Sequence, residues 1–336
     1  MAERRVPEAV RLRLSVVIPT LNEAVYLPNL LDALAVQTRP ADEIVVADAG
    51  STDGTPDIAR RYGARVVKGG TPAVGRNAGA GIATGDLLLF LDADVVPPPD
   101  FIEHAVAEFL RKGYDVATAR VVPWDGSLLE RVAHDMANLY FILMQPVLPY
   151  APGFCILVRR SLHEKIGGFD ETLWMSEDID YVRRAARCGR FGVLTSTCIP
   201  VSMRRFRKEG MLRTGAKYLW CEMQMLRGKP VRKIPFKYEF GAFPPPARHQ
   251  SRRHFRVLAV PLPLEVVQQM LQGKSTHRKE REEKSAQPPR FKNSTDPMKT
   301  LFGKESRENP VDWSLRQRRA ECNGRVDPPG ASGPVL

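Results

Sequence analysis

The sequence predicts an α/β fold: a mostly parallel, doubly wound sheet with helices on both faces, followed by a largely disordered C-terminal tail. Three observations support this fold class. Short apolar, β-branched runs alternate with segments of helical periodicity from residue 14 onward. The runs are apolar along almost their whole length, as expected of strands that are buried on both faces. The chain has 336 residues, of which 43% are apolar, and this is enough to fill a large core.

The first half of the predicted domain contains four strands and the helices between them. The strands are expected at residues 14–18 (LSVVI), 43–47 (EIVVA), 64–67 (ARVV) and 86–91 (DLLLFL). After the first strand, Tyr26 and four leucines up to Leu34 recur at helical spacing and predict a helix. Asp53, followed by Gly-Thr-Pro, begins another helix as an N-cap residue with an early proline behind it.

The pattern after residue 112 is less regular but continues the alternation. Strands are expected at residues 115–122, 154–158 and 191–198, and helices at 127–145 and 178–188. We therefore predict one folded domain over residues 14–243, with a more regular half at 14–112 and a less regular half at 113–243. Residues 1–13 form an N-terminal extension. Residues 244–336 are basic, Pro-rich and without clear periodicity, so we expect a mostly disordered tail with one short helix near 264–272.

The positive charge of the chain is concentrated in this tail. The net charge is +12, and residues 241–336 alone hold 18 Lys and Arg against 10 Asp and Glu. A basic chain suggests nucleic acid or an anionic membrane as a partner. Because the excess lies mainly in the tail, we expect no specific nucleic-acid partner. Five cysteines without a C-x-x-C pair argue against a zinc site and a disulfide framework.

The sequence contains no segment that we expect to cross a membrane. Residues 1–13 are charged and lack the apolar core of a signal peptide, so the protein is expected in the cytoplasm. The most apolar stretch, residues 139–158, is interrupted by Gln145 and three prolines and falls short of the roughly 18 uninterrupted apolar residues of a span. We expect this stretch to be buried or interfacial.

Three unusual polar segments directly follow predicted strands. They are residues 19–23 (PTLNE), 48–53 (DAGSTD) and 92–94 (DAD). In a parallel sheet, ligands bind at the carboxyl ends of the strands, where the chain turns into the helices. We therefore expect the three segments to converge on one edge of the sheet.

The pair Asp92 and Asp94 is the most informative of these features. Two carboxylates at a strand end can hold a divalent cation, and hard oxygen ligands suit Mg²⁺ or Mn²⁺. The alternative is a pair that only shapes the turn and caps the next helix. Asp48, similarly, stands where a carboxylate could accept a hydrogen bond from a nucleotide base, or where it could simply belong to a turn.

Four segments in this order resemble a family 2 glycosyltransferase with the nucleotide-sugar fold called GT-A. They are VVIPTLNEAVYLPNLLDAL, EIVVADAGSTDGT, GRNAGAGIATGDLLLFLDAD and KIGGFDETLWMSEDIDYVRRAARCGR, within residues 14–205. The resemblance implies an inverting enzyme that uses a nucleotide-sugar donor and a divalent metal. It also implies that residues 14–243 are the catalytic domain, with the donor half at 14–112 and the acceptor half at 113–243. Ala49 departs from the family, whose members often carry a second acid there, and this leaves the identity of the base open.

The resemblance also implies roles for single residues. Metal binding is expected at Asp92 and Asp94. Acceptor-side positions are expected at Gly153, Phe154 and Glu177. Contacts with the nucleotide-sugar are expected at Pro19, Thr20, Asn22, Glu23, Asp48, Arg76, Asn77, Asp92 and Ala93. The alternative for Arg76 is an exposed helix residue, and the alternative for Gly153 and Phe154 is a turn and a core position.

Asp178 is the expected catalytic base. Inversion at an anomeric carbon requires the acceptor hydroxyl to lose its proton while it attacks opposite the leaving nucleotide, so a carboxylate must lie across the sugar from the diphosphate. By resemblance, this carboxylate belongs to Asp178. The alternatives are that Asp178 caps the helix that begins there, and that Glu177 or Asp180 holds the acceptor.

A basic cluster follows the last predicted strand. Arg204 and Arg205, with Arg207 and Lys208, suit a mobile loop that closes over the diphosphate of the donor. The same cluster could equally be a solvated basic face, or, with Lys217, could meet the phosphates of a membrane.

These observations support an enzyme that transfers a sugar from a UDP- or GDP-sugar to the hydroxyl of a saccharide or lipid-linked acceptor, with inversion. One alternative is a polyprenyl-phosphate glycosyltransferase at the cytoplasmic face of an anionic membrane. The apolar helix expected at 128–148 and the basic cluster favour it, whereas an ionised phosphate acceptor would not need Asp178. An alternative of another class is a non-catalytic nucleotide-binding scaffold, which only Ala49 supports.

Overall fold

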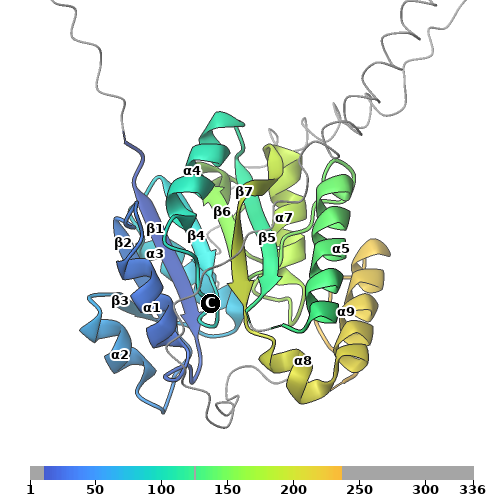
Figure 1. The fold of residues 1–336 in the computed structure, drawn as a ribbon, viewed down its shortest axis with the longest axis horizontal. Helices are drawn as coiled ribbons and strands as arrows, with labels where there is room; N and C mark the ends of the chain where they lie inside the picture. Colours follow the sequence, from blue (N-terminus) through green and yellow to red (C-terminus); the bar gives the residue numbers. More distant parts are fainter. Residues whose placement is uncertain (1–10, 125, 237–336) are drawn as a thin grey trace, which may run out of the picture. The chain divides into compact units, whose positions relative to one another are not determined.

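The computed structural model describes residues 11–124 and 126–236 (Figure 1). Its strands are β1 (Leu14–Thr20), β2 (Glu43–Asp48), β3 (Arg65–Lys68), β4 (Leu87–Leu91), β5 (Val116–Pro123), β6 (Cys155–Arg159) and β7 (Phe191–Val201). Its helices are α1 (Leu27–Ala35), α2 (Thr55–Arg61), α3 (Pro72–Ile82), α4 (Phe101–Arg111), α5 (Leu128–Met144), α6 (Arg160–Lys165), α7 (Glu177–Cys188), α8 (Arg204–Glu209) and α9 (Met211–Leu226).

The strands form one sheet in the order β3-β2-β1-β4-β6-β5-β7. The strand β6 runs antiparallel to its neighbours β4 and β5. The other neighbouring pairs of the described sheet are parallel. The prediction of a mostly parallel sheet is therefore confirmed.

Helices cover both faces of this sheet. Alternate residues of the central strands point to opposite faces, and the residues on each face pack against a different set of helices. On β1, Val16 and Ile18 pack into a core with apolar residues of α1, α2 and α4, whereas Val17 packs into a second core with residues of α3, α6 and α7. On β4, Leu89 belongs to the first core and Phe90 to the second. The doubly wound arrangement predicted from the continuous apolar runs is also confirmed.

The order of the strands brings several chain segments to one edge of the sheet. The strand β1 lies between β2 and β4, so the carboxyl ends of these three strands meet where the strand order reverses. Ligands of doubly wound sheets bind at such a point. At the end of β7, Val201 forms a bridge with Val95, just after β4. The chain that follows β7 therefore reaches the same edge.

The basic cluster after β7 differs from the expectation. It forms the helix α8 and not a loop. Arg205 and Glu209 form an ion pair one helical turn apart, at 3.3 Å, and Gly210, with φ of 84°, ends the helix. A pair at this spacing favours a helix over a mobile loop.

The apolar stretch at residues 139–158 divides into two parts. The residues of β6 within it are buried, whereas Tyr140 and Leu143 of α5 are exposed. No helix of the described part of the chain is both long and apolar enough to cross a membrane. The predictions for residues 1–10 and for the tail lie outside the described residues, and the domain boundaries stay predictions.

Candidate active site

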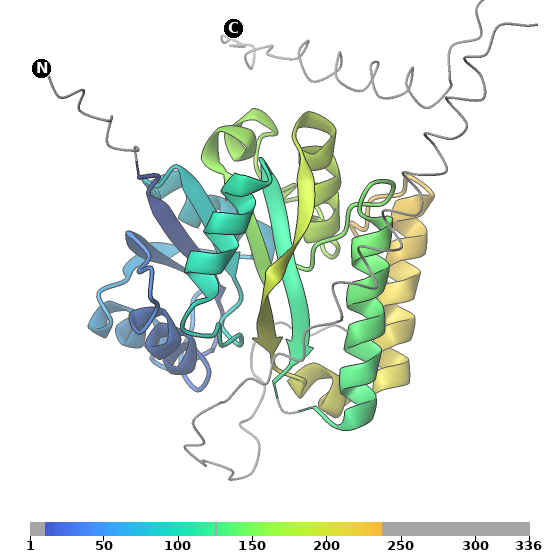
Figure 2. The ribbon, with the colours of Figure 1, turned by 45° about the horizontal axis from the view of Figure 1, so that its top comes forward.

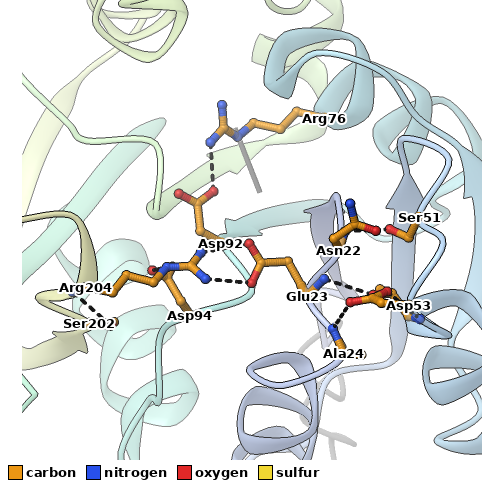
Figure 3. A network of polar contacts seen from close by, with 11 residues as sticks. Asn22, Glu23, Ala24, Ser51, Asp53, Arg76, Asp92, Asp94, Ser202 and Arg204 are labelled. Atoms are coloured by element: carbon orange, nitrogen blue, oxygen red, sulfur yellow. Dashed lines mark hydrogen bonds and ion pairs between the residues drawn. The ribbon is translucent and has the colours of Figure 1, made fainter. Parts of the chain in front are cut away.

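Hydrogen bonds tie the loops after β1 and β2 together (Figure 3). The backbone N–H of Asn22 donates to Ser51 Oγ at 2.7 Å. The side-chain oxygen of Asn22 accepts from the N–H of Thr52 at 2.9 Å. Asn22 has a φ of 55°, in the left-handed region that Asn adopts more readily than most residues. Two of the three polar segments expected at one edge of the sheet are therefore in direct contact.

Asp53 adds to this connection. Its Oδ2 accepts from the N–H of Ala24 at 2.9 Å, and its Oδ1 accepts from the N–H of Thr55 at 3.1 Å. The hydroxyl of Thr55 in turn accepts from the N–H of Glu23 at 2.9 Å. The N-cap residue of α2 is Gly54 and not Asp53 as expected. Asp53 lies one position before the N-cap and still accepts a hydrogen bond from the first residue of the helix, Thr55. These bonds fix the backbone that carries Glu23.

Asp48 is buried beside Thr20, and both of its carboxylate oxygens are used by the turn. Oδ1 accepts from the hydroxyls of Thr20 at 3.1 Å and Ser51 at 2.6 Å, and Oδ2 accepts from the N–H groups of Gly50 at 3.0 Å and Ser51 at 2.8 Å. A carboxylate offers about four acceptor positions. A hydrogen bond to a nucleotide base would therefore replace one of these four, and this contact stays a prediction.

Arg204, the first residue of α8, points at carboxylates that follow β1 and β4 (Figure 3). Its two terminal nitrogens donate to the two oxygens of Glu23 at 2.9 and 2.7 Å, and its Nε lies 2.9 Å from Asp94 Oδ2. The guanidinium also lies over the ring of Tyr26, 4.3 Å from the centroid. Burial raises the pKa of Glu23 and of Asp94, and the charge of Arg204 opposes this rise. Arg204 thus joins the ends of β1, β4 and β7.

Arg76 of α3 is buried between two further carboxylates. Its Nη2 lies 2.9 Å from Asp92 Oδ1, and its Nη1 lies 2.8 Å from Glu177 Oε1. The guanidinium lies 5.5 Å from the ring centroid of Phe169. Arg76 is only 2% exposed, so the alternative of an exposed helix residue is wrong. The side chain links the strand end that carries Asp92 to the N-terminus of α7.

Asp178 is partly buried in the first turn of α7. Its Oδ2 accepts from the N–H of Gly153 at 2.7 Å, and its Oδ1 accepts from the N–H of Ile179 at 2.8 Å. Burial raises the pKa of Asp178 well above the ordinary value, the charge of Glu177 raises it further, and Arg76 lowers it. The N-cap residue of α7 is Ser176, which disfavours capping as the main role of Asp178. A carboxylate with a raised pKa among charged groups is a candidate general base.

Gly153 is placed where a side chain would not fit. A Cβ atom added to it would lie 2.5 Å from Nη2 of Arg76. The backbone of Gly153 therefore approaches both the buried guanidinium and, through its N–H, the carboxylate of Asp178. The next residue, Phe154, is partly buried and packs against the first core. This agrees with the alternative interpretation of Phe154 as a core residue, and its role on the acceptor side stays a prediction.

Three other expected donor residues make mainly internal contacts. The side-chain oxygen of Asn77 accepts from the N–H of Phe169 at 2.8 Å and its amide donates to the carbonyl of Phe169 at 2.9 Å, so Asn77 fixes the segment before α7. Pro19 lies against α3, where a Cβ added to Gly75 would be 3.1 Å from it. Ala93 is buried in the first core, which leaves its backbone for a donor contact.

Two aromatic residues of the site, Tyr26 and Phe169, contact arginines, and these contacts were not predicted from the sequence. Tyr26 was predicted only as part of an apolar helix face, yet its ring lies against Arg204. Phe169 lies against Arg76 and stacks on Tyr181, with ring centroids 3.9 Å apart. The segment Gly-Gly-Phe before the acidic pair was a signal for Phe169, whereas nothing local to the sequence connects Tyr26 with an arginine of α8.

The carboxylates of the site suit a divalent cation that has further ligands. Asp92 and Asp94 are hard oxygen donors, as Mg²⁺ and Mn²⁺ prefer. Within residues 11–124 and 126–236, no group of three or more His, Cys, Asp or Glu residues is arranged to hold an ion. Magnesium sites commonly use one or two carboxylates and complete the shell with water and substrate phosphates. The two aspartates fit such a site.

Ligands of an open α/β sheet bind where the strand order reverses, and the polar residues of the candidate site lie at this point. Residues 15–167 match the model of the family described as Glycosyl transferase family 2. This part of the chain is a domain of that family, and the resemblance drawn from the four sequence segments is confirmed.

Two relatives and one solved structure extend this result. Glycosyltransferase AglE of Haloferax volcanii is 30% identical over 189 residues, which cover 52% of this chain and 62% of AglE. Validoxylamine A glucosyltransferase of Streptomyces hygroscopicus subsp. jinggangensis is 42% identical over 219 residues, which cover 50% of each protein. The chain thus spans between 50% and 62% of the length of these relatives.

The solved structure is the mannosyltransferase PcManGT from Pyrobaculum calidifontis in complex with GDP-Man and Mn²⁺. It matches with a TM-score of 0.50 and 24% identity over 63% of this chain and 65% of PcManGT. This likeness concerns the fold, and it confirms the predicted GT-A type.

Proposed function

We propose that the chain transfers a sugar from a UDP- or GDP-sugar to an acceptor hydroxyl, with inversion and with the help of a divalent metal. The observation that carries this proposal is the position of Arg76. One buried guanidinium contacts both Asp92, on the side expected to hold the donor diphosphate, and Glu177, next to the candidate base Asp178. Arg76 therefore connects the proposed diphosphate site with the residue next to the proposed base.

In the proposed reaction, the carboxylate of Asp178 accepts the proton of the acceptor hydroxyl. The hydroxyl oxygen forms a bond to the anomeric carbon while the bond between that carbon and the diphosphate breaks. The electron pair leaves with the nucleoside diphosphate. Because the attack comes from the side opposite the leaving group, one displacement inverts the anomeric centre. The N–H of Gly153 holds the carboxylate in place for this step.

Asp92 and Asp94 are the residues that we propose for the metal. Bound there, Mg²⁺ or Mn²⁺ supplies positive charge that stabilises the leaving diphosphate. The presence of Mn²⁺ with GDP-Man in PcManGT agrees with this choice. Arg204 stands beside Asp94 and is the arginine we propose to contact the diphosphate. Arg205, which pairs with Glu209 on its own helix, is the weaker of the two candidates.

The nucleotide is proposed to bind over the joined loops after β1 and β2. Pro19, Thr20, Asn22, Glu23 and Asp48 come together there, on the loops that hydrogen bonds hold in place. The choice between uracil and guanine is left open by Ala49. The name of one relative, a glucosyltransferase, supports transfer of a hexose as the reaction class.

The pH dependence of the reaction tests the role of Asp178. The base works only when ionised, so kcat/KM should fall on acidification with a midpoint above the ordinary aspartate pKa of about 3.9. Glu177→Gln removes the neighbouring negative charge, lowers the pKa of Asp178 and should move the midpoint to lower pH. Glu164→Gln, an exposed carboxylate of α6, is the control and should leave the midpoint in place. A midpoint that does not move in Glu177→Gln would contradict the assignment.

The scaffold alternative remains distinguishable in the same assays. A protein that binds UDP or GDP in Mn²⁺ but releases no sugar from any nucleotide-sugar would be a binding module. The presence of a buried Arg76 between two carboxylates, which has no evident use in a protein that only binds the base, favours the enzyme.

A further inference from the structure

The helix α5 presents a face of apolar side chains to solvent. The exposed residues Leu128, Val132, Met136, Tyr140 and Leu143 recur every three or four positions, so they lie on one side of the helix. Leu128 is 79% exposed and Met136 is 64% exposed. A helix at a protein surface normally directs its polar side chains to water. The exposed face of α5 is instead mostly apolar, with the exposed charged residues Arg131 and Asp135 at one margin of it.

The sheet side of α5 explains this orientation. Asn138 is a polar residue in the middle of the helix, and it is buried. Its side-chain oxygen accepts from the N–H of Val121 in β5 at 2.9 Å, and its amide donates to the carbonyl of the same residue at 2.8 Å. These two bonds fix one side of α5 to β5, and the apolar side chains remain outside.

The helix α9 repeats the arrangement and lies beside α5 (Figures 1 and 2). Leu212, Leu219, Met223 and Leu226 share one side of it, and all are exposed, Leu212 by 90%. Among the described residues, twelve of the eighteen large apolar side chains that are exposed belong to α5 and α9. A concentration of this kind marks an interaction surface. We call the exposed apolar residues of these two helices the α5–α9 face.

The charge around α9 identifies the kind of partner. Residues 204–233 contain ten Arg and Lys and only two acidic residues. Arg213 on the helix and Arg227, Lys229 and Lys233 after it are exposed. An apolar helix face accompanied by Lys and Arg is typical of a helix that lies in the interface of an anionic membrane.

A protein partner of the same sequence fits this charge less well. In a symmetric dimer the same patch of each copy meets itself, so the basic residues of α9 would face their own copies. Like charges across an interface oppose association. A bilayer, in contrast, offers acyl chains to the apolar side chains and phosphates to the basic ones.

We propose that the α5–α9 face docks on the surface of an anionic lipid bilayer. This goes beyond the transfer reaction and holds whichever sugar is transferred. The surface is connected to the acceptor side of the candidate active site. Phe141 of α5 stacks on Tyr150, with ring centroids 4.7 Å apart, and Arg183 of α7 pairs with Glu222 of α9 at 2.5 Å. Docking would therefore hold the element that carries Asp178 next to the membrane.

Flotation of the full chain with vesicles tests the proposal without any use of the transfer reaction. The protein should float with vesicles of equimolar phosphatidylcholine and phosphatidylglycerol and much less with phosphatidylcholine alone. Leu219→Glu on the α5–α9 face should lower the affinity for the mixed vesicles by about tenfold or more, because an apolar side chain that would be buried becomes charged. Val36→Glu is the matched control and should leave flotation unchanged. Val36 follows α1, away from the α5–α9 face, and its exposed fraction of 63% is close to the 62% of Leu219.

The charged contribution has its own matched pair of variants. Arg227→Glu with Lys229→Glu should weaken flotation, whereas Arg60→Glu with Arg61→Glu on α2 should leave it unchanged. Leu226→Glu, at another exposed position of α9, serves if Leu219→Glu alters the melting temperature.

Three results would overturn the proposal. The first is no flotation with either vesicle, or equal flotation with both. The second is unchanged flotation of the Leu219, Leu226 and Arg227/Lys229 variants, because the lipid contact would then lie elsewhere in the chain. The third is a stable dimer in the absence of lipid, measured by light scattering, that Leu219→Glu dissociates.

Discussion

Asp178→Asn should lower the rate of sugar transfer by about 10²- to 10⁴-fold, the range typical of a lost general base. Asparagine has almost the same shape but cannot accept the proton of the acceptor hydroxyl. Nucleotide binding should remain nearly intact, because the hydrogen bonds of Asp178 are to the N–H groups of Gly153 and Ile179, whereas the nucleotide is expected over the loops after β1 and β2. The measurement is single-turnover transfer together with calorimetric titration of UDP or GDP in Mn²⁺.

The stability of this variant should separate chemistry from folding. Because the fold raises the pKa of Asp178, its ionised form is less favourable in the folded than in the unfolded protein. At pH values above that raised pKa, the native carboxylate therefore lowers stability, and asparagine removes this destabilisation. The gain should offset the loss of one of the two hydrogen bonds from Gly153 and Ile179, because asparagine has only one acceptor oxygen. A large loss of transfer at an unchanged melting temperature is the expected combination.

Asp180→Asn is the control for the acidic first turn of α7. Asp180 lies two residues after Asp178 and pairs with Arg184 at 2.6 Å on the same helix. Its replacement should cost little transfer activity. If Asp180→Asn abolished transfer and Asp178→Asn did not, the catalytic base would be assigned to the wrong carboxylate.

Asp92→Asn and Asp94→Asn should each weaken the Mn²⁺-dependent binding of the donor nucleotide. Each variant removes one of the two proposed protein ligands of the metal and one negative charge beside the diphosphate. We expect a loss of at least about 10- to 100-fold, which is the loss seen even for residues that only support a metal ligand. The nucleotide affinity measured in EDTA should change far less than the affinity measured in Mn²⁺.

The control for this pair is Asp57→Asn, an exposed carboxylate of α2 that pairs with Arg60 in the next turn. It changes the net charge by the same amount and should leave the effect of Mn²⁺ unchanged. Both aspartates also contact arginines, so melting temperatures belong to the experiment. An equal loss of binding with and without Mn²⁺ would indicate a role in holding Arg76 and Arg204, and would contradict the metal assignment.

The fold was largely predictable because its signals are local in the sequence. The central strands are apolar along their whole length, and the polar segments at 19–23, 48–53 and 92–94 follow them directly. In a parallel sheet, such segments must meet at the same edge. The ends of β1, β2 and β4 meet in this way. The hydrogen bond of Thr20 to Asp48 at the end of β2, and that of Asn22 to the loop after β2, result from it.

The partners of the charged residues could not be predicted in the same way. Glu23 and Arg204 are 181 residues apart, and they meet only because the end of β7 is bridged to the chain after β4. The burial of Arg76 depends likewise on Gly153, which leaves room for its guanidinium. The basic cluster was expected as a loop because its composition alone does not show the pairing of Arg205 with Glu209.

The apolar character of α5 illustrates a different limit. The sequence of this helix is apolar around much of its circumference, so periodicity does not indicate which side faces the sheet. The inner side is set by Asn138, whose amide pairs with the backbone of β5. A buried asparagine within an apolar helix is difficult to recognise before the strand that it contacts is known.

The most direct test of the central claim is a panel of UDP- and GDP-sugars, assayed for sugar release or transfer by the purified chain with Mn²⁺ and with EDTA. We predict turnover of at least one donor in Mn²⁺ and its loss in EDTA. Binding of UDP or GDP without turnover of any donor, or turnover that EDTA leaves unchanged, would contradict a metal-dependent glycosyltransferase.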